Sequence, residues 1–365
     1  MTGRKKEESS SWVKQFLVNL LLGANLVTLV LLWTCCVTTW LDPSLHPRIS
    51  VIGLAFPIFL ILNLLYLPIW LIFKPRMLVV PVFGIILCAD YILDYYPISM
   101  RGKSDDVPAL TVMTWNCHEM QYYQHDSIHY ATDYILETGA DIICLQEYTF
   151  ASERYKKLHD ELITRGYQLN HVGCISVMSR FPVLNDVAVP IEVVLGTGAM
   201  QVDLQMPDND TLSVICVHLE SNKLSSDDKD EYDAAIRSGE HEKMKDEAHY
   251  LAGKLAVAAQ IRANQINLLA KRVDSIATHH PVLMCGDFND TPISYAYQHI
   301  SRRLKNAYRS RGCGVGVTFN EKNFPVRIDH VFYTSDLTCT DVMIDHTIWA
   351  SDHYPVIARL KKRQK

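Results

Sequence analysis

Two long uncharged stretches near the N-terminus constrain the fold of this chain more than any other feature. They are Phe16–Trp40 and Ile49–Phe73. Each exceeds the roughly 20 residues that an α-helix needs to cross the hydrocarbon core of a bilayer. A second, equally apolar stretch so close behind the first is not typical of a signal peptide. The sequence therefore predicts an all-helical transmembrane region, a membrane anchor, within residues 1–97.

A third apolar segment, Met77–Leu93, is weaker because Asp90 falls within it. We expect it to cross the membrane too, with a surface hairpin as the alternative. Lysine and arginine gather before the first stretch and between the second and third, whereas only Arg48 lies between the first and second. Because such residues favour the cytoplasmic side, three spans predict an integral inner-membrane protein whose C-terminal domain is extracytoplasmic. A hairpin would leave that domain in the cytoplasm.

After residues 98–109, which have the composition of a linker, the chain resembles an ordinary soluble domain over residues 110–365. The net charge of the whole chain is −5, which argues against a dedicated, strongly basic nucleic-acid-binding protein. This part contains an odd number of cysteines, and Cys144, Cys216 and Cys285 lie in short apolar runs. We expect buried thiols rather than disulfides, which favours the cytoplasmic alternative for this domain.

Short apolar runs alternate with turns and helical patterns in the soluble part, which indicates an α/β layered domain. Helical periodicity covers Ile128–Thr138 and Lys254–His279. The expected strands are Leu110–Trp115, Ile142–Leu145, Ile175–Ser179, Ala199–Leu204, Leu212–Val217, Val282–Cys285, His330–Tyr333 and Val356–Leu360.

Residues 221–250 are highly charged and poor in large aliphatic side chains. We expect a solvated insertion, either a loop or an exposed helix, with a lid over the site as the alternative. The acidic residues between Asp227 and Asp233 would repel a polyanion such as nucleic acid.

Six short polar clusters lie at the ends of the expected strands, where the sites of α/β domains are commonly built. Three of them carry groups suited to a hard divalent cation. Glu147 follows the strand Ile142–Leu145, Asn116 follows Trp115, and Asp352 precedes the last strand. Carboxylate oxygens are the ligands that Mg²⁺ and Mn²⁺ prefer, and an asparagine amide can orient such a ligand. Each of these residues alone would as readily be an ordinary polar strand end.

The other clusters carry groups suited to acid–base chemistry. His218 ends an apolar strand, and Asp287 and Asn289 follow a glycine that permits close backbone approach to a ligand. A histidine needs a carboxylate partner to fix its tautomer and to stabilise its charged form. Asp329 is a candidate partner for His353.

Taken together, in this order, the clusters resemble the endonuclease/exonuclease/phosphatase superfamily. They read Thr-Trp-Asn, Gln-Glu, His-Leu-Glu-Ser, Gly-Asp-Phe-Asn, Ile-Asp-His-Val and Ser-Asp-His-Tyr-Pro-Val, and the resemblance extends from about Leu110 to Leu360. It implies a two-sheet α/β sandwich, the DNase-I-like fold, with its site at one end. This chain looks like a bacterial-type member in which an N-terminal membrane region precedes that domain.

The resemblance also implies roles for these residues. Glu147 would be the principal metal ligand, with Asn116 nearby and Asp352 as a further site carboxylate. Asp287 and Asn289 would position the nucleophile and the phosphate, which His218 would contact. Asp329 and His353 would form a carboxylate–histidine dyad, and either His353 or Asp287 would be the general base.

The sequence thus predicts a membrane-anchored hydrolase of phosphate esters that depends on Mg²⁺ or Mn²⁺ and needs no evident protein partner. We rank a nuclease-type phosphodiesterase first, because nucleases are common in the superfamily. A phospholipid or sphingomyelin headgroup phosphodiesterase and an inositol-phosphate phosphatase are the alternatives, since membrane anchoring brings a lipid headgroup within reach. A catalytically inactive binding module is the alternative of another class.

Overall fold

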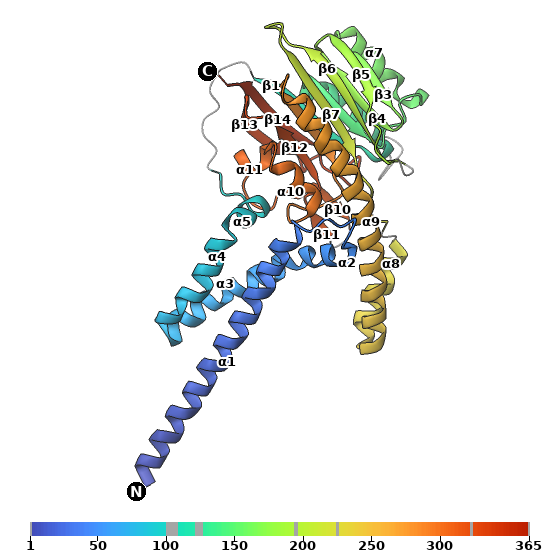
Figure 1. The fold of residues 1–365 in the computed structure, drawn as a ribbon. Coiled ribbons are helices and arrows are strands. Elements are labelled where there is room, and N and C mark those ends of the chain that lie inside the picture. The colour runs from blue at the N-terminus through green and yellow to red at the C-terminus, as the bar shows by residue number, and fades with distance from the viewer. Residues whose placement is uncertain are drawn as a thin grey trace.

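The computed structural model describes residues 2–99, 109–120, 127–192, 196–223, 226–321 and 324–363. Most of the expected linker, residues 100–108, lies outside the described residues. The apolar N-terminal part is helical, as predicted, and it extends away from one end of the C-terminal domain (Figure 1). Its elements are α1 (Thr2–Thr38), α2 (Pro47–Ser50), η1 (Val51–Ala55), α3 (Phe56–Phe73), η2 (Pro75–Leu78), α4 (Val79–Leu87) and α5 (Ala89–Tyr95).

The helical region is long and apolar, and much of its apolar surface is exposed. Trp12–Thr38 and Pro47–Phe73 are long and apolar enough to cross a membrane. Pro75–Leu87 and Ala89–Tyr95 are bent by 63° relative to each other and would form either a third, broken span or a re-entrant loop. Large apolar side chains of α1 and α3 are exposed, and water would disfavour such a surface. Inside, the Asn25 amide donates to Asn63 Oδ1 at 3.1 Å, and Trp70 Nε1 donates to Asn25 Oδ1 at 2.9 Å. Buried polar groups of this kind join helices where no water is available.

The C-terminal domain contains two six-stranded mixed sheets, which confirms the predicted α/β sandwich. The first sheet has the order β13 (Leu337–Ile344), β14 (Val356–Lys362), β1 (Leu110–Asn116), β2 (Ile142–Gln146), β4 (Ile175–Ser179) and β3 (Gln168–Val172). The second has the order β5 (Val183–Ala188), β6 (Gly198–Gln205), β7 (Thr211–His218), β8 (Val282–Asp287), β12 (Asp329–Tyr333) and β9 (Lys305–Asn306). A short hairpin, β10 (Phe319–Glu321) and β11 (Phe324–Val326), stands apart.

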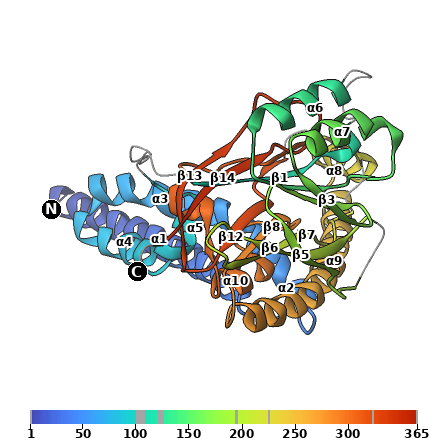
Figure 2. The same ribbon diagram turned by 90° about the horizontal axis from the view of Figure 1, so that it is seen from above.

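The sheets pack face to face, and helices cover both outer faces (Figure 2). Residues of both sheets, including Cys144, Cys216 and Cys285, form the shared core. These cysteines are buried free thiols, as predicted. The outer face of the first sheet packs on α6 (Ser127–Thr138) and α7 (Lys156–Thr164). That of the second packs on α9 (His241–Ile276) and α10 (Tyr295–Ser301).

All eight predicted strands and both predicted helices are present, with small differences at their ends. The largest difference is in α9, which begins at His241 instead of Lys254 and therefore includes part of the charged insertion. The rest of the insertion contains α8 (Ser226–Ser238), so the described residues bear out an exposed helix rather than a loop.

The helical region and the sandwich meet at two places. Asp42, between α1 and α2, accepts a hydrogen bond from Asn267 of α9 at 2.9 Å. Asp94, at the end of α5, accepts one from Gln298 of α10 at 2.8 Å. The connection from α1 to α3 and the end of α5 therefore lie against the same side of the sandwich (Figure 1).

Candidate active site

The predicted site residues converge because of the strand pairing. Asn116 and Gln146 end the parallel strands β1 and β2 side by side, and Glu147 follows directly. In the other sheet, His218 and Asp287 are paired at the ends of the parallel strands β7 and β8. Asp329 begins β12 opposite Asp287, since that pairing is antiparallel. The ends of four strands and the start of a fifth thus meet at one edge of the sandwich.

Asn116 links Glu147, which follows a strand of the first sheet, to Asp287 of the second sheet. The backbone of Glu147 has a φ of 48°, which is uncommon outside glycine and marks a tight turn after β2. The Asn116 amide donates to Glu147 Oε1 and to Asp287 Oδ2, both at 3.0 Å. The amide oxygen of Asn116 accepts from the backbone N–H of His118 at 3.2 Å. Asn116 therefore fixes two carboxylates from opposite sheets relative to each other.

Gly286 allows β7 and β8 to approach closely before Asp287. Its φ is 140°, and a Cβ there would lie 1.9 Å from the carbonyl oxygen of Val217. Asp287 Oδ1 accepts from the backbone N–H of Asn289 at 2.7 Å, and the Asn289 amide donates to the Leu219 carbonyl at 2.9 Å. These bonds leave Asp287 Oδ2 directed towards the site.

Two histidines face this carboxylate. His218 Nε2 lies 3.6 Å from Asp287 Oδ2 and 3.7 Å from Glu147 Oε1. Its other nitrogen, Nδ1, lies 2.8 Å from the carbonyl oxygen of Gly196, which fixes the orientation of the ring. His353 Nε2 lies 3.8 Å from Asp287 Oδ2.

His353 and Asp329 form a buried pair, with 2.9 Å between Nδ1 and Oδ2. Burial favours the neutral imidazole, but the charges of Asp329 and Asp287 outweigh that effect and raise the pKa of His353. The main chain holds the pair in place, because Trp115 Nε1 donates to the His353 carbonyl at 2.9 Å. The Asp329 backbone N–H donates to Thr318 Oγ1 at 3.1 Å. The ring is thereby positioned with Nε2 facing the site.

Sequence reasoning missed His118, which follows Asn116 by two residues. Its Nδ1 lies 3.2 Å from Glu147 Oε2 and 3.8 Å from Asp352 Oδ1. The hydrogen bond with Glu147 raises the pKa of His118. Burial acts to raise the pKa of Glu147, but His118, His218 and Asn116 together lower it to about 2. The sequence feature that could have indicated His118 is its place in Thr-Trp-Asn-Cys-His, two residues after Asn116.

The donor set fits a hard divalent cation. Glu147, Asp287 and Asp352 bring carboxylates to one pocket, and within the described residues their ion pairs are with histidines only. A buried oxygen, Asp329 Oδ1, has no hydrogen-bond partner in that part of the chain. Asp287, Asp329 and His353 also present ligand atoms within 4.8 Å of one another. Since Asp329 is already bonded to His353, we regard Glu147 and Asp352 as the better ligands.

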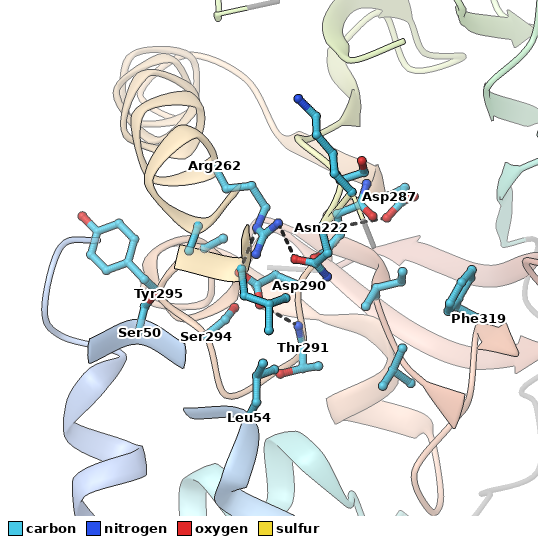
Figure 3. A pocket seen from close by; sticks show the side chains of 18 of the residues that line it. Ser50, Leu54, Asn222, Arg262, Asp287, Asp290, Thr291, Ser294, Tyr295 and Phe319 are labelled. Carbon is cyan, nitrogen blue, oxygen red and sulfur yellow. Dashed lines mark hydrogen bonds and ion pairs between the residues drawn. The ribbon is translucent and has the colours of Figure 1, made fainter. Parts of the chain in front are cut away.

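The pocket around these residues has a volume of about 400 Å³. Arg262 of α9 lies in its wall, where it donates to Asp290 Oδ2 at 3.1 Å and to Asn222 Oδ1 at 2.9 Å (Figure 3). The N-terminal region contributes a further part of the lining, which sequence reasoning did not anticipate. Figure 3 labels Ser50 and Leu54 of that region in the same pocket as Asp287; the N-terminal lining residues are Pro43, Ser50, Val51 and Leu54.

A two-sheet sandwich with carboxylates, histidines and an asparagine gathered at its strand ends defines a class of phosphate-ester hydrolases. The family model described as the endonuclease/exonuclease/phosphatase family matches residues 113–353, and the chain belongs to this family. The predicted resemblance is thus confirmed. A model for a domain of unknown function matches residues 18–95. No curated protein matches the chain significantly.

Solved structures of similar fold include the human Nocturnin catalytic domain with bound sulfate, which has a TM-score of 0.52 and 17% identity over 73% of this chain and 97% of that chain. The mannosyl-6-phosphatase Bt3783 of Bacteroides thetaiotaomicron has a TM-score of 0.51 and 16% identity, and the match covers 69% of this chain and 99% of that chain. D. rerio TDP2, complexed with a single-strand DNA product, has a TM-score of 0.50 and 14% identity, and the match covers 70% of this chain and 100% of that chain. These likenesses establish the fold.

Proposed function

We propose that this protein is a membrane-anchored hydrolase of phosphate esters that depends on Mg²⁺ or Mn²⁺. The observation that carries the proposal is the meeting of Glu147, Asp287 and His353 in one pocket, with His218 and Asp329 in contact with them from behind. An inactive binding module is less well supported, because the carboxylates and histidines expected for the reaction are present and lie close to one another.

Glu147 is the principal ligand of the cation in this proposal, and Asp352 is the second carboxylate. Asn116 acts by orienting Glu147, since its amide N–H groups already point at the carboxylates. A bound cation would offset the negative charge that accumulates on the phosphoryl oxygens during attack.

The remaining groups bind the phosphate and move protons. His218 Nε2 and the Asn289 side chain would contact phosphate oxygens. Asp287 Oδ2 accepts a proton from the attacking water. At the same time the water oxygen bonds to phosphorus and the P–O ester bond breaks. His353 donates a proton from Nε2 to the leaving oxygen, because Asp329 favours its protonated form. We thus assign the general base, which the sequence left open, to Asp287.

A nuclease-type phosphodiesterase is the second candidate. It is favoured by D. rerio TDP2, a protein of similar fold that was solved with a single-strand DNA product. The charge of the pocket argues against a polyanion. Among the residues that the structure describes, its lining includes Glu147, Asp287, Asp290 and Asp352 but only two Lys or Arg residues, Lys223 and Arg262. Of these, Arg262 is already paired with Asp290.

We also propose three membrane crossings and a division of the chain near residues 98–109, with the catalytic domain opposite the N-terminus. The support is the pair of contacts at Asp42 and Asp94. Asp42 follows the first candidate span and Asp94 lies at the end of the third, so both residues must be on the same side of the membrane to contact one domain.

Cys313 is an exposed free thiol and tests the arrangement directly. An impermeant maleimide should label it in sealed spheroplasts. If Cys313 were labelled only after lysis, while a control cysteine in a periplasmic protein reacted before lysis, this topology would be overturned.

The function is tested by hydrolysis assays of the full chain in detergent. The substrates are phosphate monoesters and diesters, including a single-stranded oligonucleotide, with Mg²⁺, Mn²⁺ or a chelator. Metal-dependent product release from any ester supports the proposal. No release from any of them, by protein that binds the metal, would favour the inactive binding module.

A further inference from the structure

The lining of the active-site pocket combines two chemically different walls. Glu147, Asp287 and His353 provide the charged wall. The other wall is apolar and includes Val51 and Leu54, which belong to the N-terminal region. With a divalent cation bound by its carboxylates, a pocket with this division would suit a molecule that is anionic at one end and apolar at the other.

The apolar wall is part of a candidate membrane span. Val51 and Leu54 lie within Pro47–Phe73, which is long and apolar enough to cross a bilayer. Leu54 is 38% exposed, as is Ile52 beside it. The pocket therefore borders the place where this span would leave the membrane, so an apolar chain resting on Leu54 could remain in the lipid layer.

The junction between the apolar N-terminal region and the sandwich is tightly packed beside the pocket. A Cβ at Gly53 would lie only 2.6 Å from the carbonyl oxygen of Ile293. The Ile293 side chain belongs to the buried apolar cluster of the helical region, which also includes Leu32 and Phe56. Ile293 itself lines the pocket and follows Asp290 by three residues. The membrane segment is thus a fixed part of the site wall.

We propose that the substrate is a lipid phosphate ester, with its phosphate at Glu147 and His353 and its apolar chain against Val51 and Leu54. This inference rests on the proposed phosphoesterase function. A nucleic acid would leave the apolar wall without a partner and would bring a polyanion to a lining rich in carboxylates. Water is the only co-reactant consumed: its oxygen bonds to phosphorus as the P–O ester bond breaks, and a proton passes to the leaving oxygen.

The test uses the full chain in mixed micelles of one detergent with two matched series of substrates. Ethyl and hexadecyl phosphate are the monoesters, read by phosphate release. Methyl and hexadecyl 4-nitrophenyl phosphate are the diesters, read by nitrophenol release. In the series that is hydrolysed, we expect kcat/KM to be about tenfold or more higher for the hexadecyl ester, because burial of each CH₂ favours binding. A single-stranded oligonucleotide is the competing substrate.

Two variants at one position test the wall itself. Leu54→Ser makes it polar and Leu54→Trp fills it, and both should reduce the ratio of kcat/KM for the long ester to kcat/KM for the short ester several-fold. Ile61→Ser is the matched control, because Ile61 is 58% exposed on α3 and does not line the pocket. A thermal unfolding curve like that of the unaltered protein shows that each variant is folded.

The outcomes separate the two proposals. Three outcomes would overturn the lipid assignment and leave the phosphoesterase function standing. They are equal kcat/KM for short and long esters, a preference for the long chain that neither Leu54 variant changes, and better hydrolysis of the oligonucleotide than of the esters. Absence of hydrolysis in both series and with the oligonucleotide would overturn the phosphoesterase function itself.

Discussion

Asp329 Oδ2 lies 2.9 Å from His353 Nδ1, and both side chains are buried. The two residues come from different parts of the second half of the chain: Asp329 begins β12 in one sheet, and His353 precedes β14 in the other. The pair therefore links the sheets at the edge where the site lies. It also directs His353 Nε2 towards Asp287 Oδ2, 3.8 Å away.

Replacement of His353 by alanine should lower kcat by about 10²- to 10⁴-fold, the range that positioned acid–base groups supply. Asp329→Asn should also reduce kcat, because the ring loses the charge that favours its protonated form. His279→Ala, at an exposed position near the end of α9, is the matched control. Near-full activity of His353→Ala would show that this ring takes no part in proton transfer.

Replacement of Glu147 by glutamine should weaken Mn²⁺ binding by about 10- to 100-fold or more, since loss even of a group that supports a ligand has effects of that size. Calorimetric titration of the full chain measures this directly. Glu137→Gln, on the exposed side of α6, should bind Mn²⁺ as the unaltered protein does. Equal affinities in the two variants would remove Glu147 from the metal site.

Much of the fold was predictable because its central strands are apolar on both faces. Ile142–Gln146 is buried throughout, and so is Val282–Asp287. The edge strand Val183–Ala188 was missed because five of its six residues are exposed. Leu337–Ile344 was missed as well, since threonine and aspartate interrupt its apolar pattern.

The named site residues were recognisable because each follows or precedes a strand in a fixed short cluster. The wall formed by Val51 and Leu54 was not, because nothing in an apolar stretch indicates what it will pack against. That wall depends on a contact between residues about 240 positions apart, Gly53 and Ile293. Such a contact is set by the tertiary fold rather than by any local pattern.

Replacement of Gly53 by alanine should destabilise the junction between the helical region and the sandwich by about 1–3 kcal/mol, as overpacking of a tight contact commonly does. The added methyl group would meet the Ile293 carbonyl oxygen at 2.6 Å. Gly23→Ala on α1 is the matched control, because nothing lies within 4 Å of its Cβ position. Thermal unfolding in detergent measures both. A Gly53 variant as stable as the Gly23 variant would contradict the tight junction.

His330 should make the fold sensitive to acid. Burial lowers its pKa to about 3, and the charge of Arg327 adds to the effect. Since its pKa when unfolded is about 6.5, the neutral ring contributes stability that is present above pH 6.5 and lost as pH falls towards 3. The loss should reach about 2–3 kcal/mol at pH 4.5.

The variant His330→Phe isolates that effect, because Phe288 and Phe332 already surround the ring. Relative to the unaltered protein, the variant should gain stability as pH is lowered from 7.5 to 4.5. Parallel pH dependence of the two unfolding curves would mean that His330 is not held neutral by the fold.

The most direct test of the central claim is product release from a phosphate ester by the purified full chain, measured with Mg²⁺, after chelation and after Mg²⁺ is restored. We predict turnover that disappears with chelator, returns with Mg²⁺ and falls by orders of magnitude in Glu147→Gln and His353→Ala. Turnover that survives chelation, or that both variants retain in full, would contradict a metal-dependent phosphoesterase at this site.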